Sequence, residues 1–153
     1  MNAAGQLAAI LFAVAGAAAG TYLIKGPPVR ALVCNPAELK PGEICLQQIP
    51  TDAKILWVDA RPRKDWQKNG LSGSVLWSLE FGEDQKAFEA DVAMRIMETP
   101  RVIVYCSSES CDLSAQVADK IKGLDLGADV SVLRGGWQAL YEAGRIKDSS
   151  PKS

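Results

Sequence analysis

The stretch RVIVYCSSESCDLSAQVADKI, Arg101 to Ile121, determines the fold that we expect for this chain. Its first part, Val102 to Tyr105, is a short apolar run of β-branched and aromatic residues, which is typical of a buried strand. Cys106 follows directly, a serine-rich loop comes next, and a segment with helical spacing begins after Cys111. The stretch therefore predicts a strand, a short loop and a helix, with a cysteine where the strand ends.

The same alternation of short strands and helices continues on both sides of this stretch. Three more strands are expected, over Lys54 to Asp59, Val75 to Trp77 and Asp129 to Leu133. The expected helices are a short one after Pro62, one over Asp84 to Glu98 with Phe88, Val92 and Ile96 on one stripe, one with Leu113, Val117 and Ile121 on one stripe, and one over Trp137 to Ala143. Strands that alternate with helices predict an α/β fold, a parallel central sheet with helices on both faces. Ligands of such sheets bind beyond the carboxyl ends of the strands, where Cys106 lies.

The composition excludes several classes of function. A net charge of −1 and the absence of a Lys/Arg cluster argue against nucleic-acid binding. The chain has no histidine, which excludes Ser-His and Cys-His catalytic pairs and imidazole metal sites. Of the four cysteines, Cys34 and Cys45 are too far apart for a zinc ligand pair, and Cys106 and Cys111 have an acceptable gap but lack the Gly or Pro context of a zinc knuckle. We therefore expect no metal and no cofactor.

The amino-terminal region predicts a membrane anchor over residues 1–25. Residues 7–24 form an uncharged apolar run near the minimum length that crosses a bilayer. A cleavable signal peptide is the alternative, but residues 1–6 lack its positive charge. Gly16 and Gly20 form a GxxxG pattern through which two anchors would form a weak homodimer. We expect a single-pass membrane protein.

Residues 26–50 predict a linker, because they hold five of the eight prolines. Its later part, Glu43 to Gln48, is expected to dock on the domain that follows. That domain spans residues 51–146, and residues 147–153 are expected to be a disordered tail.

The sequence leaves open on which side of the membrane the domain lies. Lys25 and Arg30 follow the anchor, and the positive-inside rule then favours the cytoplasm. Cys34 and Cys45 favour the opposite side, because a disulfide between them would persist only in an oxidising compartment.

Cys106 has two interpretations on its own residues. The loop amides and the start of a helix form an anion-binding concavity that would lower the pKa of the thiol and make it nucleophilic. Ser107, Ser108 and Ser110 would allow this loop to fold tightly and would add hydroxyl donors. The alternative is an inert buried cysteine.

Four segments in order resemble a single rhodanese domain, over about residues 44–145. They are Val58-Asp59-Ala60-Arg61 with Trp66 after it, Gly70 to Ser74, Tyr105-Cys106 with the loop to Cys111, and Val132-Leu133-Arg134-Gly135-Gly136-Trp137 continuing to Gly144. The resemblance implies the rhodanese α/β fold and a sulfurtransferase in which Cys106 becomes a persulfide. It makes residues 107–111 the active-site loop, and Asp59 and Arg61 supporting residues. We expect Arg61 to form an internal salt bridge rather than to contact the substrate.

The loop departs from the family pattern in its charge. Cys111 stands where the family often has arginine, and Glu109 adds a negative charge. A dianion such as thiosulfate should then bind poorly, because a like-charge pair at about 4 Å costs on the order of 1–4 kcal/mol. A protein or low-molecular-weight persulfide is the expected donor, and a thiol the acceptor. Asp112 occupies the arginine position of the related phosphatases, so phosphatase activity is not expected.

Cys111 keeps three interpretations: a buried small residue, a resolving thiol that forms a disulfide with Cys106, and half of a transient metal site. Three functions follow from the residues together. The first is a membrane-anchored sulfurtransferase. The alternatives are a non-catalytic rhodanese-like module that binds a partner, and a redox relay that uses Cys106 and Cys111.

Overall fold

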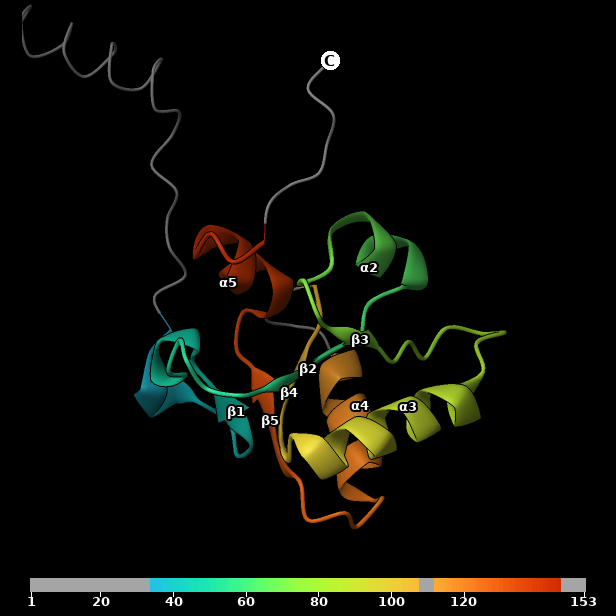
Figure 1. Cartoon of the computed structure of the whole chain (residues 1–153). Helices are drawn as coiled ribbons and strands as arrows, with labels where there is room; N and C mark the ends of the chain where they lie inside the picture. The colour runs from blue at the N-terminus through green and yellow to red at the C-terminus, as the bar shows by residue number, and fades with distance from the viewer. Residues whose placement is uncertain (1–33, 108–111, 147–153) are drawn as a thin grey trace, which may run out of the picture. The chain divides into compact units, whose positions relative to one another are not determined.

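The computed structural model describes residues 34–107 and 112–146, which form an α/β domain around one sheet (Figure 1). The strands are β1 (Glu43–Ile44), β2 (Leu56–Asp59), β3 (Val75–Leu76), β4 (Arg101–Tyr105) and β5 (Asp129–Leu133). They pair in the order β1-β5-β4-β2-β3, and every pair is parallel. The predicted parallel sheet is therefore confirmed.

Helices cover both faces of this sheet, as predicted. The 3-10 helices are η1 (Pro36–Glu38) and η2 (Leu46–Gln48), and the α-helices are α2 (Arg63–Asn69), α3 (Gln85–Glu98), α4 (Asp112–Lys122) and α5 (Gly136–Glu142). Helices α3 and α4 pack on one face, and α5 with the segment around η2 packs on the other.

Strand β4 is the centre of the fold. Val102 and Val104 point into the core formed with α3 and α4, whereas Ile103 and Tyr105 point into the core formed with α5. All four side chains have no exposed surface, because β4 lies between β5 and β2 and is covered from both sides. A strand buried on both faces needs a continuous apolar run, which explains why these residues were recognisable in the sequence.

The two long helices follow their predicted stripes with one exception. In α3, the Asp84 side chain caps the first turn, and Phe88, Val92 and Ile96 are buried. In α4, Leu113 is exposed, which corrects the predicted stripe. Steps of four residues rotate by about 40° relative to a helix of 3.6 residues per turn, so a strict i+4 series leaves the buried face.

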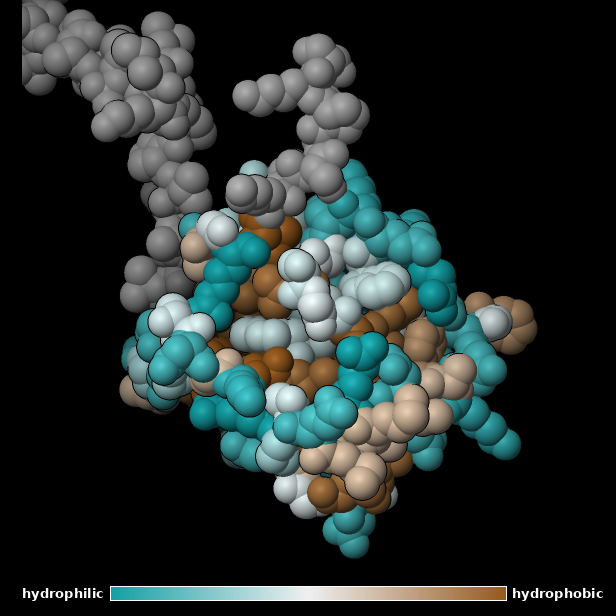
Figure 2. Space-filling view, viewed as in Figure 1, coloured by the Kyte–Doolittle hydropathy of each residue, from teal (hydrophilic) through white to brown (hydrophobic). Residues whose placement is uncertain are grey.

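The buried residues of α4 are instead Ser114, Val117, Ala118 and Ile121. Their spacing of three and four residues keeps them on one face. On the surface seen in Figure 2, pale brown side chains gather over α3, where Met94 and Met97 are exposed.

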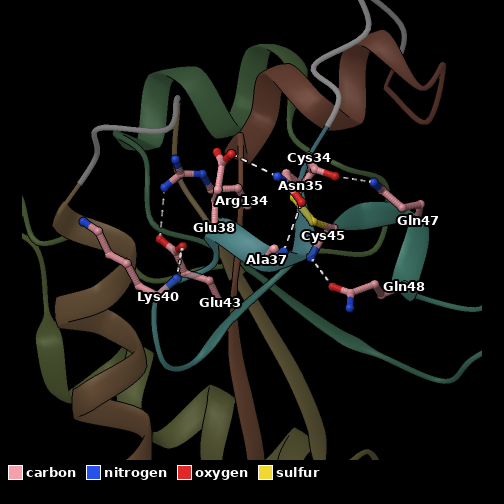
Figure 3. Close-up of a disulfide and its surroundings, with 10 residues drawn as sticks. All are labelled: Cys34, Asn35, Ala37, Glu38, Lys40, Glu43, Cys45, Gln47, Gln48 and Arg134. Atoms are coloured by element: carbon pink, nitrogen blue, oxygen red, sulfur yellow. Dashed lines mark hydrogen bonds and ion pairs between the residues drawn. A yellow bond between two sulfur atoms is a disulfide. The ribbon is translucent and has the colours of Figure 1, made fainter.

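The proline-rich stretch before the domain docks on the sheet. Glu43 and Ile44 form β1, which pairs with the carboxyl-terminal half of β5, so the docking expected for this part is confirmed. A disulfide joins Cys34 to Cys45, with their Cα atoms 5.6 Å apart, and fixes the segment that leads into β1 (Figure 3).

Residues 34–107 and 112–146 include no helix that is long and apolar enough to cross a membrane. The predicted anchor over residues 1–25, including Gly16 and Gly20, lies outside the described residues. The predicted tail over residues 147–153 also lies outside them.

Candidate active site

Cys106 lies at the carboxyl end of the central strand, where the sheet topology placed it in the sequence analysis. Its side chain is 2% exposed, and its carbonyl accepts a hydrogen bond of 2.6 Å from the Trp137 N–H at the start of α5. The preceding carbonyl, of Tyr105, accepts one of 2.8 Å from the Ala60 N–H, just after β2. Hydrogen bonds from α5 and from the residue after β2 therefore fix the backbone of Tyr105 and Cys106.

The chemical state of Cys106 bears directly on its function. Cys106 is disulfide-bonded. Cys34 and Cys45 are bonded to each other. Residues 108–111 lie outside the described residues, so the predicted anion cradle stays a prediction. Ser107, the first residue of that loop, is exposed.

Asp59 and Arg61 form the buried ion pair that the sequence predicted for Arg61. The Arg61 Nη2 lies 2.7 Å from the Asp59 Oδ2, and the Arg61 backbone N–H also donates to the Asp59 Oδ1 at 2.9 Å. The exposed fractions of the two residues are 0% for Asp59 and 4% for Arg61. Since a carboxylate and a guanidinium buried this deeply depend on each other for their charges, the pair is part of the fold at the end of β2.

The Arg61 guanidinium connects three elements of the site region. Its Nη1 donates to the Asn69 side chain at 3.1 Å, at the end of α2. Its carbon lies 5.8 Å from the centre of the Tyr105 ring and 5.4 Å from that of the Trp137 ring. The Trp137 indole N–H donates to the Asn69 carbonyl at 2.8 Å. The contacts of Arg61 thus connect β2, α2 and α5 around the end of β4, which is a structural role.

Tyr105, the residue before Cys106, completes this network on the opposite side. Its hydroxyl donates to the Ser74 Oγ at 3.3 Å and accepts from the Leu71 N–H at 3.0 Å. Burial raises the pKa of the Tyr105 phenol, and the nearby Asp59 carboxylate raises it further. Tyr105 therefore stays protonated at neutral pH and acts as a structural donor.

Arg134 is a residue of the site region that the sequence analysis did not assign to it. Val104 of β4 pairs with Val132 of β5, and Cys106 and Arg134 each follow directly after the end of their strand at the same edge of the sheet. Residues 107–111 include no lysine or arginine, whereas Arg134 follows the end of the neighbouring strand β5. The register of two parallel strands is the signal that would have found it.

Glu43 of β1 holds the Arg134 side chain in place. The Arg134 Nη1 lies 3.5 Å from the Glu43 Oε1 (Figure 3). The Arg134 backbone N–H donates to the Ile44 carbonyl at 3.0 Å. The second oxygen of Glu43 accepts from the Lys40 N–H at 2.9 Å. Arg134 therefore has a defined position although a quarter of its side chain, 26%, is exposed.

Two cavities meet at Arg134. One, of about 460 Å³, lies between η2 and α5, and its walls include Leu46, Ile49, Ala139 and Arg145. The other, of about 210 Å³, lies between β1 and α4 and has Lys40 and Asp112 at its rim. Arg134 lines both of them. Cys106 is not among the described residues that line either cavity.

Comparison with solved structures finds similar folds at low sequence identity. The N-terminal domain of a protein from Clostridium difficile 630 has a TM-score of 0.49 at 15% identity, covering 67% of this chain and 98% of that one. A Saccharomyces cerevisiae homologue of single-domain rhodanese and of the Cdc25 phosphatase catalytic domain has a TM-score of 0.46 at 17% identity, covering 60% and 70%. An As-Sb reductase from Leishmania major has a TM-score of 0.45 at 20% identity, covering 59% and 64%.

No curated protein matches the sequence significantly. A family model does match it: the model of the rhodanese-like domain covers residues 45–143. The match begins at the disulfide-bonded Cys45, next to β1, and ends just after α5. Because it spans more than half of the 153 residues, the chain belongs to the rhodanese-like domain family.

Proposed function

We propose that this chain is a membrane-anchored sulfurtransferase that carries sulfane sulfur as a persulfide on Cys106 and passes it to a thiol acceptor. The observation that carries the proposal is the position of Cys106 within the family domain. It lies at the carboxyl end of the central parallel strand, with its backbone fixed by Trp137. Ligands of parallel sheets bind at this edge.

The reaction takes place in two displacement steps at sulfur. In the first, the Cys106 thiolate attacks the outer sulfur of a persulfide donor. The S–S bond of the donor breaks, the donor leaves as a thiolate, and Cys106 becomes a persulfide. In the second, an acceptor thiolate attacks that outer sulfur, which restores the Cys106 thiolate and yields the acceptor persulfide. No external oxidant or reductant is consumed.

Mass spectrometry of the purified full chain tests this proposal. The reduced protein would be incubated with a low-molecular-weight persulfide, and the peptide that contains Cys106 would be followed. We expect this peptide to gain the mass of one sulfur atom and to lose it on addition of a thiol acceptor. Cys106→Ser is the control and should gain none. No added sulfur on the wild-type peptide would contradict the proposal.

The disulfide-bonded state of Cys106 favours a second candidate function, a thiol-disulfide relay with Cys111 as the resolving thiol. The Cys111 thiolate would attack the inner sulfur of the Cys106 persulfide. The outer sulfur would leave as hydrosulfide, reduced by two electrons, and the two cysteines would become a disulfide. A dithiol reductant would then be needed for the next turnover.

Hydrosulfide measurement separates the two functions. In a relay, the wild type should release one hydrosulfide for each disulfide formed, and Cys111→Ser should release none and accumulate the persulfide. In a simple transferase, Cys111→Ser and the wild type should transfer sulfur to the acceptor at similar rates.

The Cys34–Cys45 disulfide supports a location of the domain in an oxidising compartment, with residues 7–24 as the anchor. Labelling of intact cells with a membrane-impermeant thiol reagent tests this arrangement. Cys34 and Cys45 should become labelled only after reduction of the cell exterior. Labelling only after membrane lysis would place the domain on the other side.

A further inference from the structure

The larger cavity, between η2 and α5, has the size and the lining of a small-molecule site. Its volume of about 460 Å³ lies within the range of about 300–1,000 Å³ that such sites have. Leu46 and Ile49 form its apolar wall on the η2 side, and Ala139 and Ala143 form the wall on the α5 side. The function proposed for Cys106 does not involve this cavity, because its described lining does not include that cysteine.

The η2 wall of the cavity is fixed by covalent and hydrogen bonds. Cys34, which lines the cavity, is bonded to Cys45, the residue before η2. The Gln47 side chain donates to the Cys34 carbonyl at 2.7 Å (Figure 3). The Gln48 side chain accepts from the Cys45 N–H at 2.9 Å. Since these bonds hold the wall in one conformation, a ligand would not have to order it on binding.

The α5 wall ends in a motif that determines where Arg145 stands. Gly144, with a φ of 71°, ends the helix in the left-handed region, and its N–H donates to the Tyr141 carbonyl at 2.9 Å. The Arg145 N–H donates to the Leu140 carbonyl at 2.9 Å, which completes a Schellman motif. The motif satisfies helix carbonyls that would otherwise disfavour an anion, and it fixes the backbone of Arg145 beside the cavity.

The charges that line the cavity favour a ligand with one negative charge. Arg134, Glu142 and Arg145 line it, so two positive charges and one negative charge give the lining a net charge of +1. Arg134 is paired with Glu43. Glu142 accepts from the Gln138 side-chain amide at 3.1 Å. In the part of the chain that the structure describes, the Arg145 guanidinium has no hydrogen-bond or ion-pair partner. A half-buried guanidinium of this kind is suited to a carboxylate, which it binds through two parallel N–H donors.

We propose that this cavity binds a small monoanionic molecule with an apolar body, and that Arg145 holds the carboxylate of that molecule. The apolar body lies between Leu46 and Ile49 on one side and Ala139 on the other. This site goes beyond the function proposed for Cys106, and neither proposal depends on the other.

Two probes of nearly the same shape test the charge requirement. They are hydrocinnamate, an anion, and hydrocinnamamide, its neutral amide. Methyl NMR of the purified full chain, labelled at leucine and isoleucine, would follow the Leu46 and Ile49 resonances as each probe is added. We expect both resonances to shift with hydrocinnamate. Its Kd should be about three- to tenfold lower than that of the amide, as for a charge-assisted hydrogen bond to a half-buried group.

Four variants separate the role of Arg145 from that of the cavity walls. Arg145→Gln should bring the two Kd values within about twofold of each other, whereas Arg145→Lys should keep most of the preference for the anion. Arg95→Gln is the matched control for net charge and should leave the preference unchanged, because α3 packs on the other face of the sheet. Ala139→Leu should abolish the binding of both probes, because the larger side chain fills the cavity from α5.

The outcomes that would overturn the proposal are distinct for the site and for its cation. No shift of the Leu46 and Ile49 resonances with either probe would overturn the site. Equal Kd values for the two probes, or a preference that Arg145→Gln leaves unchanged, would overturn the assignment of Arg145. The Ile96 and Ile121 resonances, from the core on the other face of the sheet, should keep their positions in every variant and thereby show that each variant is folded.

Discussion

The buried ion pair of Asp59 and Arg61 allows the sharpest quantitative prediction about the fold. Arg61→Met removes the guanidinium and leaves the Asp59 carboxylate, which has no exposed surface, without its cation. Breaking a buried pair from one side costs about 3–5 kcal/mol. With a urea dependence of about 1.5 kcal/mol per molar, the midpoint of unfolding should fall by about 2–3 M.

Urea unfolding followed by tryptophan fluorescence would measure this effect, and a double-mutant cycle would assign it. We expect Asp59→Asn to destabilise as well, because it leaves the buried Arg61 cation without a full charge partner. The double variant should cost less than the sum of the two, by about 0.5–3 kcal/mol.

An exposed ion pair of the same chain provides the matched control. Arg95 and Asp91 in α3 lie 3.0 Å apart, with about half of each side chain exposed. Arg95→Met should change the free energy of unfolding by only about 0.3–0.5 kcal/mol. If Arg61→Met cost no more than Arg95→Met, the reasoning from burial would be refuted.

Three more predictions concern stability. Cys34→Ser should lower the free energy of unfolding by about 3 kcal/mol, the chain-entropy value for a bridge between residues 11 apart, and an unchanged urea midpoint would contradict this. Because its raised pKa keeps the Tyr105 phenol protonated in the folded state, stability should be fully present below about pH 10 and fall as the pH rises further. That alkaline fall should be shallower in Tyr105→Phe, and equal slopes would argue against the assignment. Ile96→Ala, in the core, should cost about 2–5 kcal/mol, against less than about 0.5 kcal/mol for the exposed Met97→Ala.

The central part of the fold was predictable because its physical signals are local. The apolar run of β4 and the apolar stripe of α3 each lie within one continuous stretch of sequence. Proline at residue 100 separates them, and it marks the end of the helix in the sequence as in the structure. The position of Cys106 at a sheet edge follows from the same local pattern.

Strand β1 could not be predicted in the same way. It has two residues, too few for a periodic pattern, and it lies in a stretch whose prolines indicate a linker. It forms because Glu43 and Ile44 complete the edge of β5, a contact between residues about 90 positions apart. The sequence analysis considered a Cys34–Cys45 disulfide only as an argument about the side of the membrane, and it is the folded backbone that brings their Cα atoms to 5.6 Å.

The candidate site shows the same division between local and non-local information. The sequence identified Cys106 from its own surroundings, but a search for a cation within residues 107–111 found none. Arg134, 28 positions away in the chain, follows the end of β5, the strand that pairs with β4. In a parallel sheet, the residues that follow neighbouring strands lie at the same edge and all contribute charge there. The sequence of one loop therefore does not list all the charges that act on the cysteine at its start.

The edge strand β1 also affects the surroundings of the central strand β4, after which Cys106 lies. Arg134 is paired with Glu43, Glu43 belongs to β1, and β1 lies within the segment that the Cys34–Cys45 disulfide closes. The stretch that resembles a linker therefore contributes a charged residue to the site region. It follows that a shortened chain beginning at residue 51 would keep Cys106 and Arg134 but lose the carboxylate that positions the guanidinium. Activity measurements made on such a fragment would describe a different electrostatic environment from that of the full chain.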